Sequence, residues 1–181
     1  MEYRIKLIQI LAEDEQIFEI LKIIRGLKLN DCWVGAGCIR NKVWDVLHEL
    51  TTEQFNDVDV IFFDESDISE RLEKEIEEKL LELNKTFKWS VKNQARMHLR
   101  NNHSKYDDTR NAISHWPETA TAVAARLNSD DEIEILAPYG LDDLFNLLVR
   151  PTPNFNQIIF QKRADDKQWN NQWKKLKFIT L

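Results

Sequence analysis

Two aspartates stand two positions apart at the start of a short apolar run. Asp57 and Asp59 lead into residues 60–63, a β-branched and aromatic segment bounded by polar residues, which predicts a strand. Because side chains alternate along a strand, both carboxylates are expected on one face, close to each other. Two close carboxylates repel, and a hard divalent cation such as Mg²⁺ removes the conflict. The pair therefore predicts a magnesium site, with a solvated strand start as the alternative.

A turn of small residues lies upstream of the aspartates. A strand is predicted over residues 29–34 and a helix over 38–50, and Gly35, Ala36 and Gly37 connect them. Glycine lets a backbone approach a ligand closely, and the N–H groups of such a turn can hold phosphate oxygens, together with the helix N-terminus that follows. This turn is therefore a candidate phosphate site, and a plain strand-to-helix connection is the alternative.

Basic and amide side chains follow two of the predicted strands. Arg40 falls in the first turn of the helix after Gly37, and its planar guanidinium could bind two phosphate oxygens or pair with surface carboxylates. Lys92 and Asn93 follow a strand predicted over residues 87–91, and ligands collect at strand ends in open α/β sheets. Lys92 could neutralise a phosphate, whereas Asn93 could bind a base or ribose, or cap a helix. All three are candidate phosphate- or nucleotide-binding residues.

The order of these motifs resembles a known superfamily. Gly35-Ala36-Gly37 followed by Asp57-Val58-Asp59-Val60 is similar to the signature of the polymerase-β-like nucleotidyltransferases, in which a small-residue turn holds the triphosphate and a D-x-D or D-x-E strand binds the catalytic metals. Within that superfamily, the chain resembles the bacterial nucleotidyltransferase-like family of unknown function. Four further stretches carry this resemblance: residues 39–45, 91–98, 116–121 and 137–144.

The resemblance implies a nucleotidyl transfer that depends on Mg²⁺, with one or two ions. A hydroxyl of an unknown acceptor would attack the α-phosphate of an NTP, and pyrophosphate would leave. Asp57 and Asp59 would be the catalytic metal ligands, and residues 35–37 with Arg40 would bind the phosphates.

Two features depart from the superfamily pattern. The glycine turn lies further before the aspartate pair than the usual signature has it, and the third carboxylate expected on a later strand is replaced by Ser90 or Lys92. A catalytically inactive nucleotide-binding or regulatory module is therefore the first alternative. A protein-interaction module that uses apolar helices and the C-terminal tryptophans is the second.

Composition and charge limit the class of protein. The 181 residues are 43% hydrophobic and 31% charged, as in soluble globular domains. A net charge of −6 and a pI of about 5.3 argue against general attraction to nucleic acid, and charges interrupt every apolar run that could cross a membrane. The two cysteines match neither a disulfide framework nor a metal knuckle, and the charged residues after Met1 do not resemble a signal sequence. We therefore expect a cytoplasmic protein with reduced thiols, whose oligomeric state stays open.

The periodicity of the chain predicts an α+β fold, in which helices flank a small mixed sheet. We expect a single domain over residues 1–181, with a nucleotidyltransferase-like core at 28–100 and a more helical extension at 101–181 packed on it. Within the extension the sequence predicts helices over 118–127 and 141–148, a strand at the sheet edge over 133–136, and a basic helical segment from residue 154. Trp169 and Trp173 would lie on one face of that segment and hold it against the core.

Overall fold

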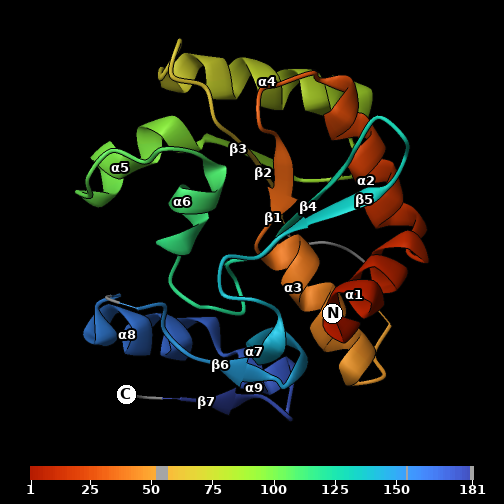
Figure 1. The fold of residues 1–181 in the computed structure, drawn as a ribbon, viewed down its shortest axis with the longest axis vertical. Helices are drawn as coiled ribbons and strands as arrows, with labels where there is room; N and C mark the ends of the chain where they lie inside the picture. The colour runs from red at the N-terminus through yellow and green to blue at the C-terminus, as the bar shows by residue number, and fades with distance from the viewer. Residues whose placement is uncertain (52–56, 154, 180–181) are drawn as a thin grey trace.

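A five-stranded mixed sheet lies at the centre of the computed structural model, which describes residues 1–51, 57–153 and 155–179 (Figure 1). Its strands are β1 (Trp33–Gly35), β2 (Val58–Phe62), β3 (Trp89–Asn93), β4 (Ala124–Leu127) and β5 (Ile133–Leu136). They lie in the order β3-β2-β1-β4-β5. β2 and β3 are parallel, whereas the other neighbouring pairs are antiparallel. The predicted α+β class and mixed sheet are confirmed, and β5 lies at the sheet edge as predicted.

Helices cover both faces of this sheet. They are α1 (Glu2–Ala12), α2 (Glu15–Gly26), α3 (Gly37–Leu47), α4 (Glu70–Leu83), α5 (Gln94–Asn101), α6 (Thr109–Ser114), α7 (Asp142–Phe145), α8 (Gln157–Lys167) and α9 (Trp169–Gln172). A small parallel pair, β6 (Leu148–Val149) with β7 (Lys177–Phe178), lies beside α9 (Figure 1). Within the described residues, no helix has the length and apolar character needed to span a membrane.

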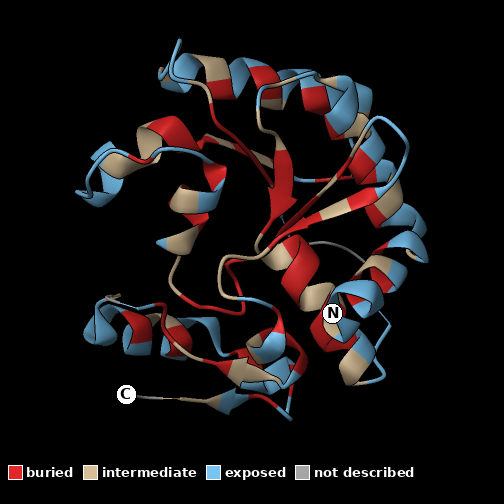
Figure 2. Ribbon diagram, viewed as in Figure 1, coloured by how far each residue is buried: buried red, intermediate tan, exposed pale blue. Residues whose placement is uncertain are grey.

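Alternation along β2 separates the two faces of the sheet. Val58, Val60 and Phe62 belong to the main core with the apolar faces of α1, α2 and α3, whereas Ile61 packs with Trp33 and Ile113 of α6 in a second cluster. Figure 2 shows the strands buried and the outer faces of the helices exposed. Since Asp59 lies two positions before Ile61, its side chain points to the face that carries α6.

The sheet extends beyond the predicted core segment. Residues 28–100 supply β1, β2 and β3, and the following part of the chain supplies β4 and β5. β1 also begins later than the strand predicted over residues 29–34, and it includes Gly35. The extension therefore completes the sheet in addition to packing on it.

Of the helices predicted in the extension, the one over 118–127 is wrong and the one over 141–148 is too long. Within 118–127, Glu118 forms an isolated bridge with Pro151, turns follow, and the last four residues are β4. Helix propensity favours the alanines of this segment, but their small side chains also let β4 pair closely with β1, and that tertiary pairing overrides propensity. Within 141–148, α7 covers only four residues and β6 follows.

The C-terminal arm, defined here as residues 157–173, packs on α3. Trp169 and Trp173 make edge contacts with Trp44, with ring centroids 5.6 and 5.1 Å away. Trp173 Nε1 also donates a hydrogen bond of 2.8 Å to Oδ1 of Asp45, a buried residue of α3. The predicted attachment by two tryptophans is confirmed. Both rings are buried against the core, so neither is a surface for a partner protein.

Candidate functional site

The candidate site lies where β1 ends and β2 begins. These strands are antiparallel with Gly35 opposite Asp59, so the turn after β1 and the carboxylates of β2 meet at one edge of the sheet. A cavity of about 460 Å³ is found here. Of the residues singled out from the sequence, Ala36, Gly37, Arg40, Asp57 and Asp59 line this cavity. The remainder of the wall comes mainly from the C-terminal arm.

The turn has a different geometry from the one that its glycines suggested. The residue with a positive φ is Ala36, with φ 54° and ψ −125°, a conformation that is strained for a residue with a side chain. Gly35 is needed for packing, because a Cβ there would lie 2.8 Å from Cη2 of Trp116. Gly35 is also absent from the cavity wall, whereas a Cβ at Gly37 would meet only ordinary contacts. The turn therefore approaches the cavity through Ala36 and Gly37.

The N-terminus of α3 points its backbone donors toward this cavity. Ala36 is its N-cap, and no side chain caps the helix. The Ala36 N–H donates to the carbonyl oxygen of Val123 at 3.1 Å. The first N–H groups of a helix have no partner inside the helix, and Gly37 and Cys38, which carry two of them, line the cavity. This arrangement suits an anion such as a phosphate.

Asp59 is the more enclosed of the two carboxylates. It lies opposite Ser90 of β3, whose hydroxyl donates a hydrogen bond to it. Burial raises the pKa of Asp59, and the charge of Asp57 adds to that rise. The Ser90 hydrogen bond and the positive charges of Arg40 and Lys167 act in the opposite direction. The like charge of Asp57 is thus one reason why the ionised form of Asp59 is disfavoured.

Asp57 lies immediately before β2 at the solvent side of the cavity. Its side chain is 47% exposed, and its Oδ1 forms an ion pair with Nζ of Lys88 at 2.6 Å. Because Lys88 is itself 77% exposed, water screens this pair and the lysine can move aside for another cation. Asp57 is therefore accessible from solvent, and Asp59 is held deeper in the wall.

Arg40 is a buried cation that forms no ion pair with any residue that the structure describes. Its Nη1 donates to Thr121 Oγ1 at 2.7 Å, and its Nε and Nη2 donate to Asn41 Oδ1 at 3.2 and 2.8 Å. The guanidinium carbon lies 4.7 and 4.5 Å from the ring centroids of Trp44 and Trp169. Burial lowers the pKa of Arg40 to about 10. Since the hydrogen-bond partners are neutral, an anion in the cavity would stabilise this charge.

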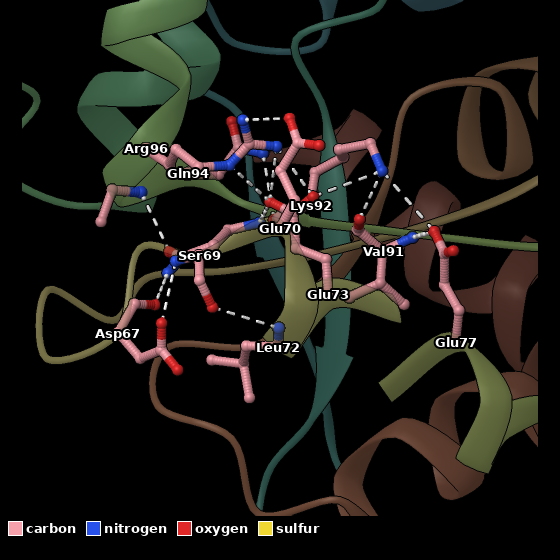
Figure 3. A network of polar contacts seen from close by, with 12 residues as sticks. Asp67, Ser69, Glu70, Leu72, Glu73, Glu77, Val91, Lys92, Gln94 and Arg96 are labelled. Atoms are coloured by element: carbon pink, nitrogen blue, oxygen red, sulfur yellow. Dashed lines mark hydrogen bonds and ion pairs between the residues drawn. The ribbon is translucent and has the colours of Figure 1, made fainter. Parts of the chain in front are cut away.

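Lys92 and Asn93 lie at the other end of the sheet. β2 and β3 are parallel, with Asp59 opposite Ser90 but Phe62 opposite Asn93. Lys92 Nζ lies 3.5 Å from carboxylate oxygens of Glu73 and of Glu77 on α4 (Figure 3). The structure does not bring this lysine to the cavity.

Asn93 has a structural role at that end. Its side chain accepts a hydrogen bond from the Ala95 N–H and caps α5, and its amide donates to the carbonyl oxygens of Asp64 and Asp67. The helix cap, which was the alternative for Asn93, is what the structure shows. The nucleotide-binding assignment of Lys92 and Asn93 therefore has no support in the geometry of the cavity.

Several cavity residues were missed from the sequence. Thr121 of the segment before β4 and Arg163, Lys167 and Gln168 of the C-terminal arm line the wall. The basic character of the last helical segment was the only available signal. It could not show that this segment packs beside a turn more than a hundred positions earlier.

The donor set fits one Mg²⁺ that is completed by substrate. No cluster of three or more histidine, cysteine, aspartate or glutamate side chains suited to a metal occurs among the described residues. Two carboxylates in one cavity are nevertheless a common protein contribution to a Mg²⁺ site, because phosphate oxygens and water supply the other ligands. The mutual repulsion of Asp57 and Asp59 is what such a cation would remove.

Comparisons with known proteins agree with this geometry. A sequence profile described as nucleotidyltransferase matches residues 22–178. A structure determined by NMR, described as a CCA-adding enzyme head domain, is 38% identical with a TM-score of 0.87, and the match covers 97% of this chain and 95% of that chain. A comparison with proteins of curated function finds no match.

Longer proteins share the fold at low identity. A CCA-adding enzyme in complex with CTP is 12% identical, with a TM-score of 0.59 over 95% of this chain. The Thermotoga maritima CCA-adding enzyme complexed with tRNA is 13% identical, with a TM-score of 0.60 over 95% of this chain. The present chain spans 43% and 42% of these two proteins, respectively.

Proposed function

This chain belongs to the nucleotidyltransferase family, and on that premise we propose that it binds an NTP with Mg²⁺ and transfers the nucleotidyl group to a hydroxyl of an acceptor. Asp57 and Asp59 hold one Mg²⁺, and a second ion would take most of its ligands from the phosphates. The similar proteins were studied with CTP and ATP, which makes these the first nucleotides to test.

One observation supports this proposal above the others. The cavity holds a buried guanidinium without an ion pair among the described residues, and it holds two carboxylates in the same wall. An anion alone would satisfy Arg40 but would be repelled by Asp57 and Asp59. A cation alone would satisfy the aspartates but not Arg40. A metal-bound polyphosphate carries both charges and satisfies both groups.

Each side chain has a defined task in this reaction. The N–H groups of Gly37 and Cys38 donate to phosphate oxygens at the start of α3, and Arg40 binds the phosphates from the side of the cavity. Ser90 holds the Asp59 carboxylate in place through its hydrogen bond. When bound, Mg²⁺ neutralises the negative charge that develops on the reacting phosphate. The acceptor hydroxyl approaches from the solvent side, where Asp57 is exposed.

The first alternative is a nucleotide-binding module without catalysis, and one observation favours it. Ser90 lies directly opposite Asp59 on the neighbouring strand, at the position where the superfamily pattern expects a third carboxylate. Serine can orient Asp59, but it cannot serve as a charged metal ligand at neutral pH. A Ser90→Asp variant that releases pyrophosphate from NTP and an acceptor hydroxyl, where the wild type does not, would support the inactive module.

A titration followed by NMR tests the binding site. Addition of Mg²⁺ and CTP or ATP should shift the resonances of residues 36–40 and 57–59 in the wild type. Asp59→Asn should remove these shifts, because it removes a metal ligand without changing the shape of the side chain. Asp130→Asn, a change at an exposed residue outside the cavity, is the matched control and should behave as the wild type. If millimolar Mg²⁺–NTP leaves every resonance of the wild type in place, the proposed function is rejected.

A further inference from the structure

The C-terminal arm builds a large part of the cavity wall. Arg163 and Lys167 of α8 both line the cavity, and they lie one helical turn apart on the same face. Neither belongs to the stretches on which the resemblance to nucleotidyltransferases was based, although both lie within the residues 22–178 that the family profile matches. They add two positive charges to the one that Arg40 brings from α3.

Arg163 is held in position by a buried carboxylate. Its Nε lies 2.6 Å from Oε1 of Glu118, a residue that is 1% exposed, and its guanidinium carbon lies 5.6 Å from the ring centroid of Trp169. Among the described residues, none accepts a hydrogen bond from its two terminal nitrogens. Because the fork of the guanidinium is rigid, a fixed Nε also fixes the direction of these remaining donors.

Lys167 is the last residue of α8, where the arm turns. Gln168 follows in a left-handed conformation with φ 46° and starts α9, so the chain bends beside the cavity. No carboxylate of the described chain pairs with Lys167 Nζ, although its charge acts on Asp59. A lysine that faces a cavity without a partner is available to an anionic ligand.

We propose that Arg163 and Lys167 bind the part of an NTP that leaves as pyrophosphate. This inference rests on the proposed function, because the reacting α-phosphate must lie at Asp57 and Asp59, where the metal binds. The rest of the triphosphate then extends toward the arm, whose two cations have unused donors. The arm thereby selects triphosphates over monophosphates, and a segment more than a hundred residues from the turn becomes part of the substrate site.

Binding measurements with three probes test this assignment. Isothermal titration calorimetry on the full chain measures the binding of ATP, of inorganic tripolyphosphate and of AMP, each in the presence of Mg²⁺. Lys167→Ala and Arg163→Ala should weaken the first two by about 10- to 100-fold, the loss expected for one charge-assisted hydrogen-bonding group, and leave AMP unchanged. Lys162→Ala is the matched control, since Lys162 is exposed on the same helix and does not line the cavity.

A folding control accompanies the arginine variant. Arg163→Ala leaves Glu118 buried without its ion pair, so the double change Arg163→Ala with Glu118→Gln provides a folded variant that lacks the same cation. Lys167→Ala breaks no hydrogen bond or ion pair to a described residue and should unfold close to the wild-type temperature.

The possible outcomes separate this inference from the proposed function. If both cation variants bind ATP and tripolyphosphate as the wild type does, while Asp59→Asn still abolishes ATP binding, only the role of the arm is overturned. An equal loss of affinity for AMP would also overturn it, since general damage to the cavity would then explain the result. A wild type that binds neither ATP nor tripolyphosphate overturns both proposals.

Discussion

Each end of the central sheet carries an arginine, and the two arginines differ in whether a carboxylate pairs with them. At the end where β3 finishes, Arg96 of α5 donates to Glu73 at 2.9 Å and to Glu70 at 3.0 Å, and Lys92 adds contacts to Glu73 (Figure 3). At the other end, Arg40 forms no ion pair with the described residues.

This difference separates stability from binding. Glu73 is only 3% exposed, yet its charge is compensated inside the protein, so the network needs no ligand. Around the cavity, Arg40 and Lys167 form no ion pair with a described residue, and the Asp57–Lys88 pair is exposed to solvent, so charges of both signs stay available to a bound molecule. Charged groups that are paired internally hold elements together, whereas groups of both signs kept apart around a cavity suit a ligand that carries both signs.

The largest expected effect on stability is at the paired end. Arg96→Ala leaves Glu73 buried with the Asn93 N–H and the more distant Lys92 as its remaining partners, so the free energy of unfolding should fall by about 3 kcal/mol. Urea denaturation measures the change, and Arg71→Ala, which breaks an exposed pair on α4, should alter it by less than about 0.5 kcal/mol. Equal changes in the two variants would contradict the stabilising role assigned to the buried Glu73 network.

Arg40→Met should affect ligand binding more than stability. Methionine fills much of the same space between the tryptophans and removes a buried charge without an ion pair, so the free energy of unfolding should stay within about 1 kcal/mol of the wild type. The affinity for Mg²⁺–NTP should fall by about 10- to 100-fold. Calorimetry and urea denaturation on the same sample test both statements. A large loss of stability with unchanged affinity would show that Arg40 stabilises the fold, as the Glu73–Arg96 network does, and does not bind the ligand.

The pH dependence of stability should differ between Asp59→Asn and the wild type in the absence of Mg²⁺. Because the pKa of Asp59 is raised in the folded state, its contribution to stability is complete below the unfolded pKa and is lost as the pH rises through the folded pKa. The variant should therefore be more stable than the wild type at neutral pH, and this advantage should vanish in acid. Thermal unfolding between about pH 3 and pH 7 measures it.

An aspartate with the opposite shift provides the control for this experiment. The side-chain and backbone hydrogen bonds of Ser69 lower the pKa of Asp67, so its contribution is present above the unfolded pKa and is lost as the pH falls through the folded pKa. Asp67→Asn should therefore be less stable than the wild type at neutral pH. Parallel pH profiles for the two variants would show that burial of Asp59 does not act as described.

The smallest effect on ligand binding is expected at Lys92. Its two ion pairs are long and its side chain is 33% exposed, so Lys92→Ala should lower the free energy of unfolding by about 0.5 to 1 kcal/mol. The affinity for Mg²⁺–NTP should not change, because Lys92 lies outside the cavity. A tenfold loss of affinity would show that Lys92 takes part in nucleotide binding, and it would contradict the contrast between the two ends.

Local sequence alone determined the parts of the site that lie within a few residues of each other. Period-two alternation predicted that Asp59 and Asp57, which lies immediately before β2, share one side of the chain, and helical periodicity put Arg40 in the first turn after Gly37. The resemblance to nucleotidyltransferases then joined the two motifs. The parallel direction of β3 relative to β2 could also have been predicted, since two strands joined by a single crossover helix are parallel. The start of β2 and the end of β3 must then lie at opposite edges of the sheet, which excludes Lys92 from the site of Asp59.

Only the tertiary structure decided the rest. The segment 118–127 has alanines that suit a helix, and pairing with β1 made its end a strand. Ala36 rather than a glycine takes the positive φ of the turn, whereas Gly35 leaves room for Trp116. The C-terminal arm reaches the cavity through contacts of Trp169 and Trp173 with α3. Such contacts between distant segments depend on the whole packed core and leave no local periodicity, so no window of the sequence could have placed Arg163 and Lys167 in the wall of the cavity that Asp59 lines.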